Sequence, residues 1–237
     1  MKKLQFQKLV SFTIITVVKN GAKFLKDAIK SIRDQQYPHI EYIVIDGASI
    51  DGTIDIIQQN NDIITKWISE ADNGISEAMN KGIQQSTNEI IGIIHSDDWY
   101  MPNILQPLSD FIFENPSFDV YYGKTALLGE TGSPRILPLP DSHLFLKNGM
   151  TLAHPSVFIR REAYQTYGTF ENNFKIAMDY ELLLRFIING ARFKYFNQQL
   201  AYHRPGGISN RLYSQGTAEC KLAQHIHLHK SENKIKI

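Results

Sequence analysis

The sequence of 237 residues contains a single cysteine, Cys220. One cysteine excludes an intramolecular disulfide framework and any zinc site built from cysteines alone. The sequence also lacks a marked excess of positive or negative charge, because it has 25 lysine and arginine residues and 24 aspartate and glutamate residues. A dedicated nucleic-acid-binding protein would carry a basic excess, so we expect no nucleic acid among the partners. With 43% apolar residues, the chain is too hydrophobic to be a disordered one.

Long apolar runs are absent as well, since no segment reaches the roughly 20 apolar residues that span a bilayer. The run Leu9–Val18 follows three lysines, as the core of a signal peptide does. Hydroxyl side chains interrupt the run and no small-residue cleavage site follows, so we expect a first buried strand and a cytoplasmic protein. Residues 221–237 are mildly basic. They predict a solvated C-terminal tail, with a weak peripheral contact to the inner face of an anionic membrane as an option.

Strand and helix patterns alternate through the first 125 residues. Apolar runs predict strands at 12–18, 41–46, 64–70, 89–95 and 120–124. Helical spacing predicts helices at 21–35, 51–60, about 75–83 and 103–115, the first of them capped by Asn20. Near-continuous apolar strands that alternate with helices are typical of a parallel sheet covered on both faces. The sequence therefore predicts the α/β class, with a Rossmann-like, mostly parallel central sheet flanked by helices.

The pattern changes after Lys124. Residues 126–142 are rich in glycine and proline and predict a loop, and the rest of the chain predicts strands at 154–160 and 192–196 and helices at 161–167 and 178–189. We therefore expect a mixed C-terminal half. The predicted organisation is a single domain over residues 1–220, with a nucleotide half at about 10–125, a second half at about 126–210, and the tail at 221–237.

Polar and acidic residues follow the predicted strands. Ligands of open α/β sheets bind beyond the carboxyl ends of the strands, where this chain places Asp46, Asp72 and the pair Asp97-Asp98. Carboxylates that gather at one edge repel each other unless a cation or hydrogen-bond donors are present. Adjacent carboxylates suit Mg²⁺ or Mn²⁺, which prefer oxygen ligands and leave room for substrate phosphates. The alternative is that these acids only cap the helices that follow them.

The common nucleotide-binding fingerprints are missing. The loop after the second strand reads GASIDGT, which matches neither GxGxxG nor GxxxxGK[ST]. A Rossmann dinucleotide site and a P-loop are therefore not predicted.

Six segments resemble, in their order along the chain, glycosyltransferase family 2 with the GT-A fold: FTIITVVKN, EYIVIDGASIDGT, SEADNGISEAMNKGI, IIGIIHSDDWY, HPSVFIRREAY and MDYELLLR. The similarity runs from about residue 12 to residue 209 and is closest to bacterial enzymes that build polysaccharide, lipopolysaccharide or capsule. It implies an inverting transfer of a sugar from a nucleotide-diphosphate sugar, most often a UDP-hexose, to a glycan or lipid-linked acceptor. It also implies Mn²⁺ or Mg²⁺ as a cofactor.

The resemblance assigns roles to matching positions. Thr16 and Asn20 match the loop after the first strand that contacts the nucleotide, and Asp46 matches the acid that hydrogen-bonds the base. The remaining matches are Ser49 in the loop of Asp46, Asp72 near the nucleotide or sugar, Asp97 near the ribose or sugar, Asp98 as metal ligand and Asp179 as catalytic base. For Asp179, the alternative is an ordinary acid of a first helical turn, favoured by the helix dipole.

His203 and Arg204 lie beside the paired glycines Gly206-Gly207. We expect His203 as a further metal ligand and Arg204 as a contact for phosphate, or else a plain loop. The chain also departs from the family pattern. It has Val17-Val18-Lys19-Asn20 where the family often has Pro-x-Tyr-Asn, and Ser96-Asp97-Asp98 in place of a strict Asp-x-Asp.

Two other functions stay open at this point. A sugar nucleotidyltransferase also uses a parallel sheet and Mg²⁺, but it would need a glycine-rich loop with arginine and lysine near the N-terminus, and no such loop is present. A glycan- or nucleotide-binding module with a decayed site is the other. Metal-dependent turnover separates the cases.

Overall fold

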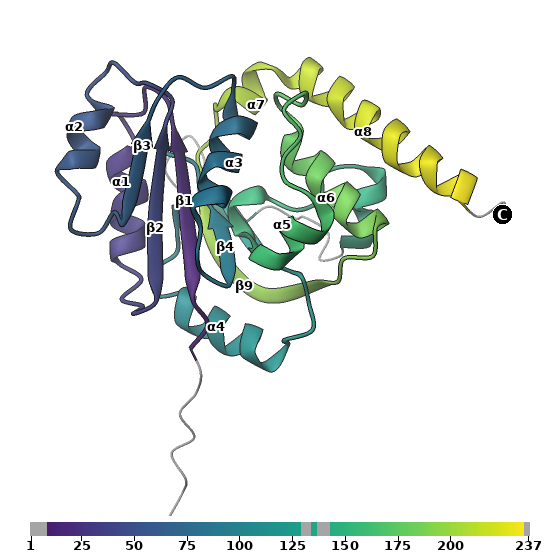
Figure 1. The fold of residues 1–237 in the computed structure, drawn as a ribbon, viewed down its shortest axis with the longest axis horizontal. Coiled ribbons are helices and arrows are strands. Elements are labelled where there is room, and N and C mark those ends of the chain that lie inside the picture. Colours follow the sequence, from purple (N-terminus) through teal and green to yellow (C-terminus); the bar gives the residue numbers. More distant parts are fainter. Residues whose placement is uncertain (1–8, 129–133, 137–142, 235–237) are drawn as a thin grey trace, which may run out of the picture.

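The computed structural model describes residues 9–128, 134–136 and 143–234 (Figure 1). Within these residues, nine strands form one sheet in the order β3-β2-β1-β4-β8-β6-β9-β5, with β7 paired to β6. The strands are β1 (Phe12–Val18), β2 (Ile40–Asp46), β3 (Lys66–Ser69), β4 (Ile90–Ile93), β5 (Trp99–Tyr100), β6 (Val120–Leu128), β7 (Pro134–Ile136), β8 (Val157–Arg160) and β9 (Phe193–His203).

The helices of the described residues lie between these strands and after the last one. They are α1 (Leu25–Arg33), α2 (Thr53–Gln58), α3 (Ile75–Gln85), α4 (Leu105–Glu114), α5 (Arg161–Tyr167), α6 (Met178–Ile188), α7 (Ile208–Arg211) and α8 (Tyr213–Lys234). Two 3₁₀ helices, η1 (His143–Asn148) and η2 (His154–Ser156), precede β8. Among the described residues, no helix is long and apolar enough to span a membrane.

The N-terminal half of the sheet is parallel. β1 pairs in parallel with β2 and β4, and β2 pairs in parallel with β3. The second half is mixed, because β8 runs antiparallel to both β4 and β6, while β6 and β9 are parallel. The prediction of an α/β fold with a mostly parallel sheet and a mixed C-terminal half is therefore confirmed.

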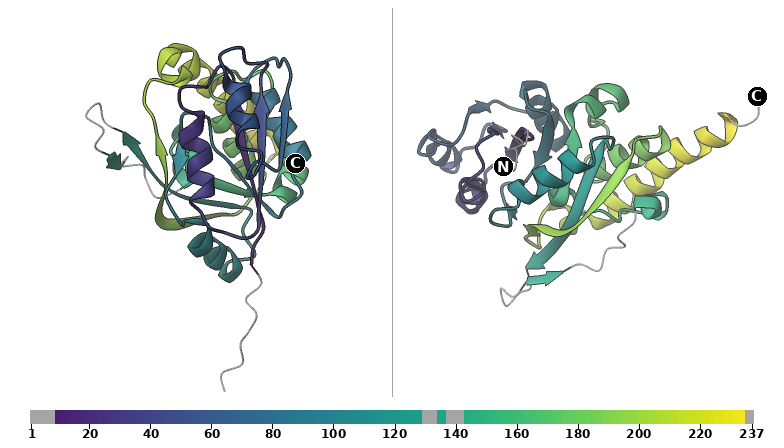
Figure 2. Two further views of the ribbon diagram at one scale, coloured as in Figure 1. Left: turned by 90° about the vertical axis from the view of Figure 1, so that its left-hand side faces the viewer. Right: turned by 90° about the horizontal axis from the view of Figure 1, so that it is seen from below.

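Helices cover both faces of the sheet, as the views of Figure 2 show. Ile15 and Val17 of β1 point into one core, which α3, α5, α6 and α8 complete. Phe12 and Ile14 point into the other core, which α1, α2 and α4 complete. Successive side chains of a strand point to opposite faces, so a strand buried on both sides must be apolar throughout. This explains the continuous apolar runs of the sequence.

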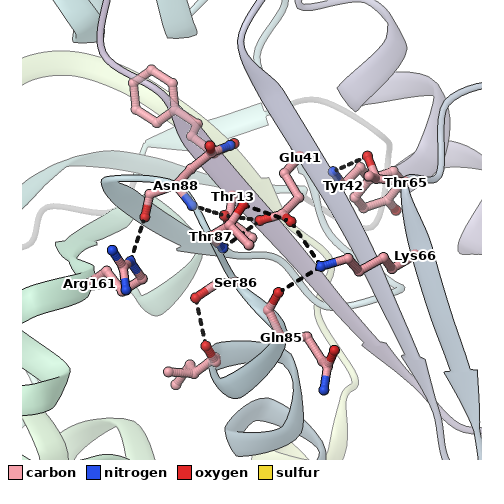
Figure 3. A network of polar contacts seen from close by, with 12 residues as sticks. Thr13, Glu41, Tyr42, Thr65, Lys66, Gln85, Ser86, Thr87, Asn88 and Arg161 are labelled. Atoms are coloured by element: carbon pink, nitrogen blue, oxygen red, sulfur yellow. Dashed lines mark hydrogen bonds and ion pairs between the residues drawn. The ribbon is translucent and has the colours of Figure 1, made fainter.

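A polar cluster around the buried carboxylate of Glu41 closes the amino end of the parallel strands (Figure 3). Glu41 of β2 is 7% exposed and accepts hydrogen bonds from the Thr13 hydroxyl at 2.6 Å and from the Thr87 N–H at 2.8 Å. Lys66 of β3 lies 3.4 Å from the same carboxylate and also donates to the carbonyl of Gln85. Burial raises the pKa of Glu41, but these donors lower it more, so the net shift is downward. The cluster ties three strands together at the end away from the candidate site.

Several boundaries differ from the sequence prediction. β9 continues to His203, beyond the predicted end at 196, and β6 continues to Leu128 inside the predicted loop at 126–142. Both extensions pair with each other across register shifts near Lys124, where polar residues break the apolar pattern. The two-residue strand β5 is too short to have a pattern. Most of the predicted loop lies outside the described residues.

The prediction of a solvated tail at 221–237 was wrong for residues 221–234, which the structure describes. α8 runs from Tyr213 to Lys234 and packs along α6 (Figure 1). Ala223 is fully buried, and Gln224 donates to the Tyr180 hydroxyl at 3.0 Å. Cys220, Ile226 and Leu228 of α8 pack against the core that contains α6, but the polar residues between them leave no clear helical pattern in the sequence. The division of the chain into domains stays a prediction.

Candidate active site

Hydrogen bonds join the loops that follow β1 and β2. The backbone N–H of Asn20 donates to the Ser49 hydroxyl at 2.7 Å, and the Asn20 side chain accepts from the N–H of Ile50 at 3.0 Å. The next two residues repeat the link, since the Gly21 N–H donates to Thr53 and the Ala22 N–H donates to Asp51. Asn20 has a φ of +52°, a left-handed conformation that asparagine tolerates. Asn20 therefore shapes this loop. The expectation that it caps α1 was wrong, because the N-cap residue of α1 is Phe24.

Asp46 organises the second loop from the end of β2. Its side chain is fully buried and accepts hydrogen bonds from the N–H of Ser49 at 3.0 Å and the hydroxyl of Ser69 at 2.7 Å. The Ser49 hydroxyl donates to its other oxygen. In this conformation both oxygens of Asp46 face the protein. Its expected contact with a base stays a prediction.

Thr16 does not lie in the loop after β1, where we expected it. It lies within β1, is fully buried, and accepts a hydrogen bond from the Tyr42 hydroxyl at 3.1 Å. The predicted strand at 12–18 already contained Thr16 and agrees with β1, so the family match alone had assigned Thr16 to the loop. Asp72, after β3, is half-buried and accepts from the N–H of Gly74. A Cβ added at Gly47 would lie 2.5 Å from its carboxylate, so Asp72 packs on the Asp46 loop.

The structure brings Asp98 and His203 together across 105 residues of sequence. Asp98 is 1% exposed, and its Oδ1 lies 2.9 Å from Nδ1 of His203 and accepts from the N–H of Arg204 at 3.0 Å. Among the described residues, Oδ2 of Asp98 is buried without a hydrogen-bond partner. Burial lowers the pKa of His203, but Asp98 and the neighbouring carboxylates raise it more, giving a net upward shift. Asp97 is half-buried, and its carboxylate faces Gly207.

Arg204 is held by the protein. Its guanidinium lies 4.2 Å from the ring centre of Phe24 and 4.9 Å from that of Trp99, and it donates to Asp27 at 3.0 Å. Its Nε donates to the carbonyl of Asp97. Trp99 stacks in turn on Tyr202 of β9 at 5.2 Å. The guanidinium of Arg204, which we had expected to contact a phosphate, therefore already has partners within the protein. Trp99 packs between Arg204 and Tyr202.

Asp179 lies in the first turn of α6. Its side chain is partly accessible yet closely surrounded by protein, and its Oδ1 accepts from the N–H of Tyr180 at 2.8 Å. Burial raises its pKa, against the opposing effects of this hydrogen bond and of the charges of His95 and His203. The charge of Asp179 in turn helps to raise the pKa of His203. The predicted base and the predicted metal ligand thus lie within electrostatic reach of each other, although 80 or more residues separate Asp179 from the Asp97-Asp98 pair.

The donor set at Asp98 fits a divalent cation in part. A buried carboxylate oxygen without a partner and an imidazole are both ligands that Mn²⁺ accepts. Among the described residues, no group of three or more histidine, cysteine or acidic side chains is arranged to hold a metal. Such a site would need oxygen atoms from a ligand, as Mg²⁺ sites that use substrate phosphates do.

Two further histidines have structural contacts away from Asp98. His154 is 7% exposed and packs on His95 and Phe170, and burial lowers its pKa to about 3, so it is neutral. Nε2 of His227 lies 2.8 Å from the buried carboxylate of Glu181.

Three contributors to this edge were not expected from the sequence. Ser69 bonds Asp46, Asp27 holds Arg204, and Glu219 of α8 bonds the backbone ahead of α6. Serine at the end of a strand is too common to be a signal, and Asp27 and Glu219 look like ordinary surface acids of helices. Asp27 and Glu219 differ from ordinary surface acids only in their hydrogen-bond partners, which lie far away in sequence.

Comparisons with known proteins agree with this geometry. A sequence model described as glycosyl transferase family 2 matches residues 13–168. An uncharacterized glycosyltransferase of Mycobacterium tuberculosis is 30% identical over 179 residues, which are 73% of this chain and 67% of that protein. TuaG of Bacillus subtilis, named as a teichuronic acid biosynthesis glycosyltransferase, is 28% identical over 200 residues, which are 81% of this chain and 78% of TuaG.

Solved structures share the fold. S. aureus TarS 1–349 superposes with a TM-score of 0.70 and 21% identity, over 86% of this chain and 63% of that one, and TarS 1–349 has also been solved in complex with UDP-GlcNAc. The mannosyltransferase PcManGT from Pyrobaculum calidifontis, in complex with GDP-Man and Mn²⁺, has a TM-score of 0.67 and 17% identity, over 96% of this chain and 64% of its own. The chain thus spans less than two thirds of either structure.

Proposed function

Because the chain belongs to glycosyltransferase family 2, we propose that it transfers a hexose from a UDP-sugar to a glycan or lipid-linked acceptor, with inversion at the anomeric carbon. The observation that carries this proposal is the meeting of two chemically different groups at one edge of the sheet. Asp98 and His203 form the first group, and Asp179, whose charge reaches His203, is the second. A transferase of this kind needs one group for the leaving diphosphate and another for the acceptor hydroxyl.

Asp98 and His203 are the proposed holders of a divalent cation, with the donor's phosphates as further ligands. When bound, Mn²⁺ or Mg²⁺ neutralises the charge that develops on the departing diphosphate. The free Oδ2 of Asp98 supports this assignment, since a buried carboxylate oxygen without a donor is costly. Because an imidazole must be neutral to bind a metal, the raised pKa of His203 makes protons stronger competitors of the cation as the pH falls.

The accessible polar groups of the neighbouring loops are the proposed donor contacts. Asn20 is exposed, and Ser49, Asp72 and Asp97 are half-buried at the same edge. Fully buried Asp46 serves the nucleotide in this proposal chiefly through the loop that it holds. Asn20 and Ala48 in the two joined loops have left-handed backbone conformations, with φ of +52° and +58°.

Asp179 is the proposed general base. A carboxylate that takes the proton of the attacking hydroxyl contributes about 10²–10⁴-fold to a rate. The raised pKa of Asp179 makes its ionised form a stronger base than an ordinary aspartate. The acidic limb of the pH–rate profile is therefore expected above the range of a free aspartate, about 3.9.

The first test is the stabilisation of the protein by nucleotides. UDP, GDP, dTDP and CDP are each added with Mn²⁺ or with EDTA, and the melting temperature is measured. A ligand of the native state raises this temperature by mass action. We expect a shift with UDP that EDTA removes. A shift of equal size with EDTA would contradict the cation site.

Two variants separate the proposed roles. Asp98→Ala is expected to abolish the metal-dependent shift with UDP, whereas Asp179→Asn is expected to keep it and to lower transfer by about 10²-fold or more. Equal loss of UDP binding in both variants would contradict the division. A protein that binds UDP but turns over no UDP-hexose, with Asp179 present, would favour the decayed binding module.

A further inference from the structure

The start of α6 has no cap of its own. Its N-cap residue is Ala177, whose side chain accepts no hydrogen bond. The first N–H groups of a helix have no partner within the helix and are usually met by a serine, threonine, aspartate or asparagine at this position. The Tyr180 N–H donates to Oδ1 of Asp179 at 2.8 Å, whereas the N–H of Ala177 depends on an acceptor from elsewhere.

Glu219 of α8 supplies that acceptor. Its Oε2 accepts hydrogen bonds from three consecutive backbone N–H groups, those of Lys175 at 3.0 Å, Ile176 at 2.8 Å and Ala177 at 2.9 Å. Its Oε1 is held by the side-chain amide of Gln215 at 2.8 Å. Burial raises the pKa of Glu219, but the donors lower it more, so it is ionised at neutral pH. One charged oxygen thus fixes the chain immediately before Asp179.

Two further contacts keep α8 in place beside α6. Gln224 donates to the Tyr180 hydroxyl at 3.0 Å, and His227 lies 2.8 Å from Glu181. Both lie deeper along α6 than Asp179. They hold the two helices together, while Glu219 acts at the end where the candidate base lies.

We propose that Glu219 is a positioning residue, which fixes the first turn of α6 and with it the direction of the Asp179 carboxylate. This inference rests on the proposed role of Asp179 as the base. Misplacing a reacting group by about 1 Å can cost about 10²-fold in rate. A hydrogen bond to a charged acceptor is among the stronger ones in a protein, so three of them define one conformation.

The first experiment examines the contact itself. Hydrogen exchange at the amides of residues 175–177 is compared in the wild type, Glu219→Gln and Glu219→Ala. Glu219→Ala is expected to speed exchange about 10–100-fold, the factor for one lost hydrogen bond to a charged group, and Glu219→Gln to speed it less. The control Glu171→Gln makes the same charge change at an exposed glutamate just before α6. Unchanged exchange in Glu219→Ala would overturn the proposal.

The second experiment uses the chain's single cysteine. Burial and the charges of Asp179 and Glu219 raise the pKa of the Cys220 thiol to about 11. The alkylation rate at pH 8 therefore reports how closely Asp179 is held. Asp179→Asn is expected to speed alkylation in the wild-type background, and by a clearly smaller factor in the Glu219→Ala background. Equal factors in both backgrounds, or no effect in the wild type, would overturn the proposal.

The third experiment reads turnover. Glu219→Ala is expected to lower the kcat for Mn²⁺-dependent UDP release from a UDP-hexose about 10–100-fold and to leave UDP affinity within about twofold. Glu219→Gln, which keeps an oxygen acceptor, is expected to regain part of the loss. A fall in affinity without a fall in kcat would contradict positioning. If the wild type binds no nucleotide, the proposed function fails, while the exchange and cysteine experiments still decide what Glu219 does.

Discussion

The carboxylate of Asp179 is closely surrounded by protein and forms no ion pair within the described residues. Burial disfavours its charged form, and backbone N–H groups and the charges of His95 and His203 compensate only in part. The protein keeps this group ionisable at a cost in stability. Groups held in this way are often found at functional sites, where the demands of chemistry outweigh those of folding.

This cost predicts the effect of Asp179→Asn on stability. Because the folded-state pKa is raised, the folded protein binds more protons than the unfolded chain between the two pKa values, and stability falls as the pH rises through that range. Asp179→Asn removes the ionisation and is expected to raise the melting temperature at pH 7. The gain should shrink as the pH falls and vanish below about 3.9, the pKa of a free aspartate. Melting curves from pH 3 to pH 8 measure this, and a gain independent of pH would contradict the burial of the charge.

At the residue scale, the sequence predicts which residues lie at the site better than it predicts their contacts. Asp98 and His203 do meet, as expected, and Asp179 lies within reach of their charges. Thr16 was misplaced because its loop role came from the family match, although the apolar run had correctly placed it inside the first strand. The ties of Arg204 to Phe24 and Asp27 could not be predicted, since both partners lie about 180 residues away in sequence.

The elements pack closely where α3 crosses the sheet. A Cβ added at Gly82 of α3 would lie 2.5 Å from Cγ2 of Ile15, a fully buried side chain of β1. The glycine therefore allows the helix to approach the strand. A glycine in the middle of a helix is unfavourable by itself. Whether a substitution at Gly82 raises or lowers the stability therefore shows which of the two effects is larger.

Gly82→Ala is expected to destabilise the protein. Alanine gains up to about 1 kcal/mol in helix propensity, but overpacking a rigid core costs about 1–3 kcal/mol. Urea unfolding measures the balance. Gln84→Ala, on the exposed side of the same helix, is the control and should stay within about 0.5 kcal/mol. The cost of Gly82→Ala should also fall in an Ile15→Ala background, and a cost that does not change there would show that Ile15 is not the obstacle.

At the element scale, long periodic segments were predictable and short or polar ones were not. The helix at 161–167 was predicted to the residue, because its apolar face faces one core. The second half of β9 was missed, because Asn197 to Gln199 give it no apolar pattern and its partner β6 lies some 75 residues earlier. α8 was missed because its few apolar core contacts, Cys220, Ile226 and Leu228, stand among polar residues such as Glu219, Gln224 and His227.

On the scale of the whole molecule, both cores are built from both halves of the sequence. One core combines Ile15 and Ile43 with Phe186, and the other combines Ile29 with Leu200. The sheet is continuous from β3 to β5. Neither half can lose its structure without exposing apolar surface of the other.

The chain is therefore expected to unfold as one cooperative unit, in agreement with the predicted single domain. Trp67 lies in β3 and Trp99 in β5, at opposite ends of the sheet. In urea, the fluorescence of Trp67→Phe and Trp99→Phe variants should each coincide with the loss of helical circular dichroism measured in the same variant. Separate midpoints for fluorescence and circular dichroism would indicate two domains.

The position of β8 between β4 and β6 has a consequence for synthesis on the ribosome. β4 is complete at Ile93, yet its second neighbour begins only at Val157. At a synthesis rate of about 5–20 residues per second, one edge of β4 stays unpaired for about 3–13 s before β8 is synthesised. An unpaired apolar edge is a template for pairing with other chains. The nascent protein is therefore exposed to aggregation until β8 has been synthesised and pairs with β4. A chain truncated before β8 would keep this edge unpaired.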